Sequence, residues 1–291
     1  MNSANHSDVV KRLRAARGFL FDLDGTLVLG NKQNEGLNVL PGASELLQLL
    51  KNNQVPVAVL TNGTVRTPSA YATKLHDAGL DIPATNIMTP SSVAAEYFVR
   101  QGMKTILVLG VEGVWRPMLD AGLDVILPSS GDRDPATADA VFVGWYREIH
   151  MDEIEAACNA VWSGAGLFAA SLVPFFATQH GRAIGSSRVI CAMITSLTDQ
   201  QPTALGKPSA EALKSAARIL HCETSEIAVV GDDPKLEIPM AHSGGALAIA
   251  VHTGIAAEED FDALPEAQRP HLSVGTVNDL FELSGRVFEQ Q

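Results

Sequence analysis

An apolar run passes directly into two carboxylates in the stretch Phe19–Thr26, which reads F-L-F-D-L-D-G-T. Its first three residues are typical of a buried strand, and Asp22 and Asp24 follow at the strand's carboxyl end. Because an unpaired buried charge costs free energy, carboxylates at this position indicate a bound cation. Gly25 allows a sharp turn, and the Thr26 hydroxyl can hydrogen-bond within it. The stretch predicts a strand that carries a chemical site at its end.

Further apolar runs of strand length alternate with helix-like stretches along the chain. In the helix-like stretches apolar residues recur at three- and four-residue spacing. Such alternation favours an α/β fold of parallel sheets covered on both faces, with ligands bound beyond the carboxyl ends of the strands. The expected strands are residues 18–22, 56–60, 105–110, 125–127, 140–144, 166–170, 227–231 and 247–251.

Two more expected strands end in residues that suit phosphate and a metal ion. The run V-A-V-L ends in Thr61, Asn62 and a glycine, which supply neutral hydrogen-bond donors for phosphate oxygens. The run I-A-V-V-G ends in the acid pair Asp232 and Asp233. Lys207, in the sequence G-K-P-S, stands just before an expected helix. Carboxylates for a hard cation, a hydroxyl and a lysine together indicate a phosphate-processing site.

Each of these signals has an ordinary structural interpretation when it stands alone. A single T-N-G is a common turn, a single G-K-P-S is usually a helix start, and a D-x-D-G-T can be a capped loop. The four together, each at an expected strand end or helix start, indicate a site instead.

Composition limits the classes of function. The chain has 291 residues and a net charge of −12, which disfavours nonspecific binding to nucleic acid. No apolar run approaches the ~18 residues of a membrane span, and the polar N-terminal segment lacks the apolar middle of a secretory signal. The cysteines, Cys158, Cys191 and Cys222, show no C-x-x-C spacing. We therefore expect a cytoplasmic protein with reduced thiols, and neither a nucleic-acid nor a membrane partner.

The four motifs D-L-D-G-T, T-N-G, G-K-P and G-D-D resemble those of the haloacid dehalogenase (HAD) superfamily. More than a hundred residues separate Thr61 from Lys207. That spacing is similar to the NagD-like and p-nitrophenylphosphatase-like branch, which carries a large cap. The resemblance implies a Rossmann-like, doubly wound parallel-sheet core formed by residues 1–100 and 203–291. It also implies an inserted α/β cap domain over residues 101–202.

The resemblance implies a two-step phosphatase mechanism. Asp22 would be the nucleophile that forms an aspartyl-phosphate. Mg²⁺ would be held by the Asp22 carboxylate, the main-chain carbonyl of Asp24 and Asp232. The Asp24 carboxyl would protonate the leaving oxygen and then activate the water.

The same resemblance assigns the phosphate contacts. Thr61 and the main-chain N–H of Asn62 would hold phosphoryl oxygens. Lys207 would neutralise the charge that develops on the transferring group, or hold Asp22 in place.

Several positions depart from the family pattern or stay open. Glu237 stands where relatives usually have aspartate, so we expect it to hold a metal-bound water. Asp233 either adds a contact behind the metal ligands or caps its own turn. His180 and Arg182 are candidate specificity residues of the cap, with a solvated histidine and a surface ion pair as the alternatives. Relatives of this type often form homodimers through the cap.

The sequence therefore predicts a Mg²⁺-dependent phosphomonoester hydrolase acting on a small phosphorylated metabolite. The substrate would be a sugar phosphate, phosphoglycolate, a nucleotide or a compound of the p-nitrophenyl phosphate type. Two alternatives stay open: a phosphotransferase or mutase of the same family, and a catalytically weak regulator that binds phosphometabolites.

Overall fold

The computed structural model describes residues 3–131, 133–178, 181–254 and 256–289, except for residues 31–36. The chain divides into two compact units. The first unit comprises residues 1–61, 71–88 and 213–291, and the second comprises residues 62–70 and 89–212. The helix over residues 90–100 therefore groups with the second unit, while the functional division into a catalytic and a cap domain stays a prediction.

The first unit is built on a six-stranded sheet in the order β15-β14-β13-β1-β4-β5, in which every neighbouring pair is parallel. The chain leaves β1 toward β4 on one side and returns from the second unit as β13 on the other side. The strand order therefore reverses at β1 and β13, and ligands of open α/β sheets bind at such a reversal. The strands are β1 (Gly18–Phe21), β4 (Val57–Leu60), β5 (Ile87–Met88), β13 (Ile227–Gly231), β14 (Leu247–Val251) and β15 (Leu272–Val274).

Alternate residues of β1 are buried on opposite faces of this sheet. Phe19 and Phe21 stack with their ring centroids 5.7 Å apart and join a core cluster with residues of α1, α2 and α11. Leu20 is also buried. Because side chains alternate along a strand, both faces of the sheet are covered, which explains the continuous apolar run.

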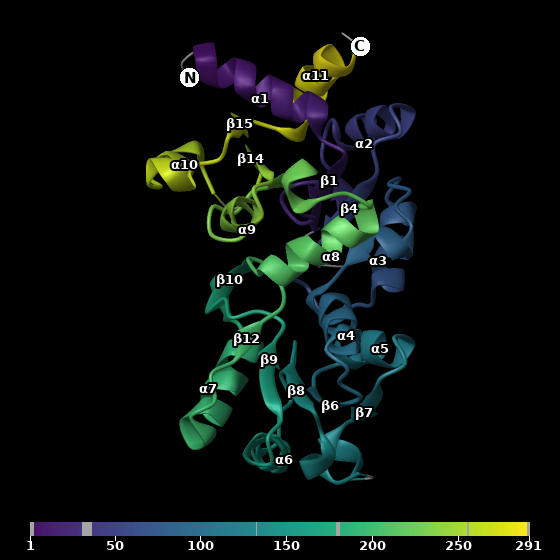
Figure 1. Cartoon of the computed structure of the whole chain (residues 1–291), viewed down its shortest axis with the longest axis vertical. Helices are drawn as coiled ribbons and strands as arrows, with labels where there is room; N and C mark the ends of the chain where they lie inside the picture. Colours follow the sequence, from purple (N-terminus) through teal and green to yellow (C-terminus); the bar gives the residue numbers. More distant parts are fainter. Residues whose placement is uncertain (1–2, 31–36, 132, 179–180, 255, 290–291) are drawn as a thin grey trace. The chain divides into compact units, whose positions relative to one another are not determined.

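Helices surround the first sheet. Those at the two ends of the chain, α1 and α11, lie side by side (Figure 1), and α9 packs on β13 and β14. The α-helices are α1 (Ser3–Ala15), α2 (Ala43–Asn52), α3 (Pro68–Asp77), α8 (Ala210–Leu220), α9 (Glu237–Ser243), α10 (Glu258–Asp262) and α11 (Val277–Phe288). Helices α3 and α8 each begin in the second unit and continue into the first. An antiparallel hairpin, β2 (Val28–Gly30) and β3 (Leu37–Val39), follows the D-L-D-G-T loop. The described 3₁₀ turns of this unit are η1 (Ala84–Asn86), η4 (Thr224–Glu226) and η5 (Glu266–Gln268).

The second unit repeats the plan with a five-stranded parallel sheet in the order β12-β9-β8-β6-β7. Its strands are β6 (Thr105–Leu109), β7 (Asp124–Ile126), β8 (Ala140–Val143), β9 (Gly166–Ala169) and β12 (Thr203–Ala204). Two 3₁₀ turns, η2 (Pro128–Ser130) and η3 (Pro135–Thr137), precede β8, and an antiparallel hairpin pairs β10 (Phe175–Thr178) with β11 (Gly181–Ile184).

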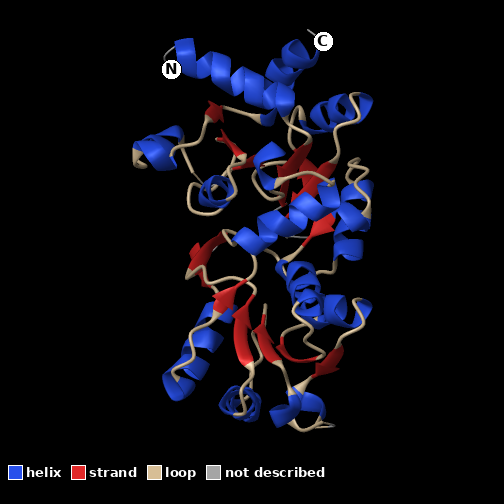
Figure 2. Ribbon diagram, in the orientation of Figure 1, coloured by secondary structure: helices blue, strands red, loops and turns tan. Residues whose placement is uncertain are grey.

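Both faces of the second sheet are also covered. The helices α6 (Met151–Trp162) and α7 (Ser186–Thr198) pack on one face (Figure 2). On the other face an aromatic group joins α4 (Pro90–Arg100) to the sheet: the Phe98 ring lies 5.0 Å from Phe168 and 6.0 Å from Phe142, in edge-on contacts. Such contacts stabilise beyond their buried area. Helix α5 (Glu112–Asp120) packs beside β6 and β7.

The predicted α/β class with parallel sheets is confirmed, and each expected strand coincides with an observed one. The elements that the apolar runs did not predict are short: β5, β12 and β15, and the two hairpins. Within the residues that the structure describes, no helix is long and apolar enough to cross a membrane.

Candidate active site

The first unit brings Asp22 and Asp232 to the ends of adjacent strands. The parallel register pairs Phe21 with Val230, and the Asp22 amide donates to the Val230 carbonyl at 2.8 Å. Asp232 follows directly on the last residue of β13. The two residues are 7% and 4% exposed. Two buried carboxylates therefore lie at the carboxyl edge of the sheet, where its strand order reverses.

Thr61 lies at the end of the strand on the other side of β1. The β1–β4 register pairs Phe21 with Val59, and the Thr61 amide donates to the Met88 carbonyl at 3.1 Å. Its side chain is 2% exposed. The ends of β13, β1 and β4 thus carry, in order, a carboxylate, a carboxylate and a hydroxyl at one sheet edge.

The loop after β1 is fixed by hydrogen bonds of its own. The Thr26 hydroxyl donates to Oδ2 of Asp22 at 3.4 Å, as the sequence predicts for a turn hydroxyl. The Gly25 amide donates to the Val28 carbonyl at 2.8 Å. Gly25 has φ of 95°, a conformation that favours glycine. Asp24, two residues after Asp22, is exposed.

The Asp232 carboxylate is packed against main chain. A Cβ atom built on Gly25 would lie 2.6 Å from Oδ2 of Asp232, and one built on Gly254 would lie 1.7 Å from it. Both distances are too short for a side chain. Oxygen donors held rigidly in this way suit a hard divalent cation, so the Asp22 and Asp232 carboxylates and the carbonyls of the loop fit the Mg²⁺ that the resemblance implies.

Glu237 and Asp233 close the turn between β13 and α9. Oε2 of Glu237 accepts a hydrogen bond from the Asp233 amide at 3.1 Å, and the Glu237 side chain is 1% exposed. Oδ1 of Asp233 accepts from the Lys235 amide at 2.7 Å, so this carboxylate caps its own turn. The expected part of Glu237 in holding a metal-bound water stays a prediction.

In the second unit Asn62 and Lys207 form a reciprocal pair. The Lys207 amide donates to Oδ1 of Asn62 at 2.9 Å, and Nδ2 of Asn62 donates to the Lys207 carbonyl at 3.1 Å. A Cβ atom on Gly206 would lie 2.7 Å from Oδ1 of Asn62. The glycine of the G-K-P motif therefore lets the amide approach, and Asn62 holds the main chain on which the buried Lys207 stands.

Sequence reasoning gave Asn62 only a main-chain role and missed this pair. It also missed the loop after β14, where the Thr253 hydroxyl donates to the Gly25 carbonyl at 2.6 Å. The available signal was another apolar strand, Leu247–Val251, which is followed by a histidine and then by a hydroxyl and a glycine.

The two specificity candidates of the predicted cap are His180 and Arg182. His180 lies outside the described residues, and Arg182 is described only by its backbone, which pairs with Ala177 between β11 and β10. Across the described part of the chain, no group of three or more His, Cys, Asp or Glu side chains is arranged to hold a metal ion. The predicted ligand set needs only two carboxylates, with the third contact from a carbonyl.

Comparisons with known proteins identify the family of the chain. A family model described as haloacid dehalogenase-like hydrolase matches residues 19–124, and a related model, HAD-hydrolase-like, matches residues 204–280. The 5'-nucleotidase YutF of Bacillus subtilis is 30% identical over 250 residues, covering 85% of this chain and 91% of that protein. The ribonucleotide monophosphatase NagD of Escherichia coli K12 is 26% identical over 250 residues, covering 86% and 92%.

A solved structure shares the fold over most of the chain. The double mutant of the thermostable NPPase of Geobacillus stearothermophilus superposes with a TM-score of 0.77 at 26% identity, covering 91% of this chain and 98% of that one.

Proposed function

We propose that this chain hydrolyses phosphomonoesters by a metal-assisted mechanism with an aspartate nucleophile. The chain belongs to the haloacid dehalogenase-like hydrolase family and is a phosphatase of its NagD-like and p-nitrophenylphosphatase-like branch. The observation that carries the proposal is the pair of buried carboxylates, Asp22 and Asp232, at adjacent strand ends beside the buried hydroxyl of Thr61. The substrate class is a small phosphorylated metabolite, as the names of its relatives indicate.

Asp22 is the proposed nucleophile. One of its carboxylate oxygens bonds to phosphorus while the bond from phosphorus to the alcohol oxygen breaks, which leaves an aspartyl-phosphate on the enzyme. The Thr26 hydroxyl, 3.4 Å from Oδ2 of Asp22, restrains that carboxylate. Asp22, Asp232 and the Asp24 carbonyl would hold Mg²⁺, which when bound would supply positive charge that lets an anionic nucleophile approach an anionic phosphate.

Asp24 is the proposed general acid and base. Its carboxyl gives a proton to the leaving alcohol oxygen in the first step. In the second step it takes a proton from the water that attacks phosphorus, and this attack releases inorganic phosphate and restores Asp22. The exposure of Asp24 supports this role, because the group must meet both the leaving alcohol and water.

Thr61, Asn62 and Lys207 are the proposed phosphate contacts. The Thr61 hydroxyl and the Asn62 main-chain amide donate to phosphoryl oxygens, and the Lys207 ammonium offsets the charge on the transferring group. The two hydrogen bonds between Asn62 and the Lys207 main chain support a shared function. We further propose that residues 1–100 and 203–291 form the catalytic core and residues 101–202 the cap. The enzyme would be cytoplasmic and would dimerise through the cap, with His180 and Arg182 tuning specificity.

Phosphate release provides the test. The purified chain should release inorganic phosphate from p-nitrophenyl phosphate when Mg²⁺ is present, lose this activity with EDTA, and regain it when Mg²⁺ is restored. Asp22→Asn should be inactive. Wild-type activity in Asp22→Asn would exclude the mechanism.

The same assay separates the alternatives. A panel of nucleoside monophosphates, sugar phosphates and phosphoglycolate identifies the substrate class. Transfer of phosphate to an added alcohol or sugar, in place of its release to water, would identify a phosphotransferase or mutase. Binding of a phosphometabolite without turnover would identify the weak regulator.

A further inference from the structure

The loop that follows β14 contacts both carboxylate-bearing loops of the first unit. The Thr253 hydroxyl donates to the Gly25 carbonyl at 2.6 Å, across 228 positions of sequence. The next residue, Gly254, lies against the Asp232 carboxylate, since a Cβ there would lie 1.7 Å from Oδ2. A Cβ on Gly25 would in turn lie 3.0 Å from the Gly254 Cα. One dipeptide therefore contacts the D-L-D-G-T loop and Asp232 at once.

The Thr253 hydrogen bond fixes the second of two successive peptide groups. The first joins Asp24 to Gly25, and its N–H is held by the Val28 carbonyl at 2.8 Å. The second joins Gly25 to Thr26, and its carbonyl is held by Thr253. Because a trans peptide is planar, its carbonyl and N–H point in opposite directions.

Fixing both peptide groups therefore fixes where the Asp24 carbonyl points. Gly25 lies between them at φ of 95°, and glycine is the residue with the greatest freedom to rotate. The hydrogen bond from Thr253 restricts that freedom at the residue that directly follows Asp24, whose carbonyl is a proposed metal ligand.

Gly254 meets a different requirement. Its φ lies outside the left-handed range that would itself demand glycine. The obstacle to a side chain at this position is the Asp232 carboxylate. The absence of a Cβ at Gly254 therefore sets how closely the main chain can confine Oδ2 of Asp232.

We propose that Thr253 and Gly254 are positioning residues for the metal-binding carboxylates: Thr253 fixes the Asp24–Gly25–Thr26 main chain, and Gly254 fixes Asp232. This inference rests on the proposed function. The dipeptide acts through other groups, which is why it lacks the acid or amide that marks the other strand ends.

The test for Thr253 compares three variants. Thr253→Val keeps the shape and removes the hydroxyl, and Thr253→Ser restores the hydroxyl. Thr224→Val is the matched control, because the Thr224 hydroxyl also donates to a carbonyl of the first unit, that of Gly244, at 2.9 Å. Thr224 lies before the amino end of β13 and Asp232 after its carboxyl end, on the order of 16 Å apart.

Three quantities are measured for each variant. They are kcat with p-nitrophenyl phosphate, the Mg²⁺ concentration that gives half of full activity, and the rise in Tm that Mg²⁺ causes without substrate. We expect Thr253→Val to need about 10- to 100-fold more Mg²⁺, as for other residues that orient metal ligands, and to show a smaller Tm rise. Thr253→Ser should recover both values, and Thr224→Val should lower only the Tm measured without metal.

Gly254→Ala tests the second half of the proposal, with Gly285→Ala of α11 as its control, since a Cβ at Gly285 meets nothing within 4 Å. The alanine at position 254 should displace Asp232 and weaken Mg²⁺ in both the activity and the Tm measurements, while Gly285→Ala should not.

The proposal is overturned if Thr253→Val and Gly254→Ala respond to Mg²⁺ as the wild type does. It is also overturned if Thr253→Ser fails to recover the Mg²⁺ response, because the hydroxyl would then not be the cause. Failure of the proposed function is distinct, since it appears in the wild type, as absent Mg²⁺-dependent phosphate release, or in Asp22→Asn, as retained activity.

Discussion

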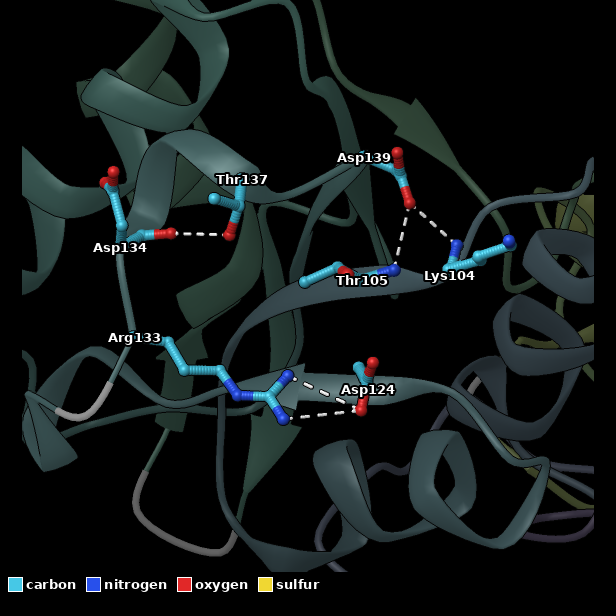
Figure 3. A network of polar contacts seen from close by, with 7 residues as sticks. All are labelled: Lys104, Thr105, Asp124, Arg133, Asp134, Thr137 and Asp139. Carbon is cyan, nitrogen blue, oxygen red and sulfur yellow. Dashed lines mark hydrogen bonds and ion pairs between the residues drawn. The ribbon is translucent and has the colours of Figure 1, made fainter.

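The two sheets of this protein share a plan but place their carboxylates at opposite strand ends. In the first unit Asp22 and Asp232 are buried at the carboxyl ends of β1 and β13. In the second unit Asp124 begins β7 and Asp139 directly precedes β8 (Figure 3). Both residues are exposed. The same architecture therefore carries buried acids at the carboxyl ends of strands in one unit and exposed acids at the amino ends in the other.

The acids of the second unit are satisfied by local partners. Oδ2 of Asp139 accepts from the amides of Lys104 and Thr105 at 2.7 and 2.9 Å, which holds the start of β6 beside β8. The hydrogen bond from Thr105 and then that from Lys104 lower the pKa of Asp139. Arg133 pairs with Asp124 at 3.4 Å. The function of a protein with such a fold therefore depends more on which residues stand at the strand ends than on the fold itself.

Replacing one acid of each set by its amide tests most directly whether the two sets differ in function. Asp22→Asn should lower kcat by at least roughly 10⁴-fold, because removing a nucleophile removes the main reaction path. Asp139→Asn should leave kcat near that of the wild type and lower the Tm. Both variants are measured by phosphate release and thermal unfolding, and a comparable loss of kcat in Asp139→Asn would show that the distinction between the two sets is wrong.

The next largest effect concerns the leaving group. Asp24→Asn should lower kcat by roughly 10²- to 10⁴-fold with alkyl phosphates, the range for loss of a general acid. The loss should be smaller with p-nitrophenyl phosphate, because nitrophenolate departs without needing a proton. Rates across a series of substituted phenyl phosphates test this, and equal losses along the series would contradict a general-acid role.

A smaller effect is expected from the amide that follows β4. Asn62→Ala removes two hydrogen bonds to the Lys207 main chain and should cost about 2 kcal/mol of unfolding free energy. It should also lower kcat by up to about 10²-fold, because Lys207 loses its fixed position.

Asn86→Ala is the matched control for this variant, because Nδ2 of Asn86 donates to the Val57 carbonyl at the other end of β4, at 2.8 Å. Urea unfolding and kcat are compared for both variants. Equal effects on kcat would assign Asn62 to stability alone.

The smallest expected effects concern the free energy of unfolding at acid pH. His271 in the first unit and Asp139 in the second should lower it in different pH ranges. Nδ1 of His271 accepts a hydrogen bond from the Ala248 amide at 3.0 Å, so this nitrogen carries no proton in the folded chain. Burial first, and then the charges of Arg12 and His242, lower the pKa of His271 to about 4. Between about 6.5 and about 4 the unfolded chain therefore binds the extra proton, and stability falls as the pH falls.

Asp139 should act at lower pH. Its folded pKa lies below the ordinary value of 3.8, so its contribution is present above that value and is lost as the pH falls through the folded pKa. Tm measured from pH 8 to pH 3 should fall less steeply between pH 6.5 and 4 in His271→Gln than in the wild type. Parallel curves over that interval would exclude His271 as the cause.

Much of the site could be predicted because its signals are local. A strand buried on both faces must be apolar throughout, so an acid at its end stands out, as Asp22 and Asp232 do. The same reasoning found Thr61. It did not show that the Asp233 carboxylate caps its own turn by accepting from the Lys235 amide, because the pair of acid letters fits more than one role.

Short elements were missed for a related reason. Strands such as β5 and β12 have two residues each, too few to show a period, and they form because a neighbouring strand supplies hydrogen-bond partners. The hairpin β2–β3 likewise depends on pairing more than on composition.

The sequence by itself determined the α/β class, the strand ends that carry acids and the family, because burial forces an apolar pattern and chemistry interrupts it. Only the tertiary structure decided that Asn62 holds Lys207 across 145 positions and that Thr253 holds Gly25 across 228. Hydroxyl and amide side chains are common in turns, and a hydrogen bond needs its two atoms within about 3 Å. Which distant carbonyl comes that close depends on the order of the strands, and no local pattern encodes it.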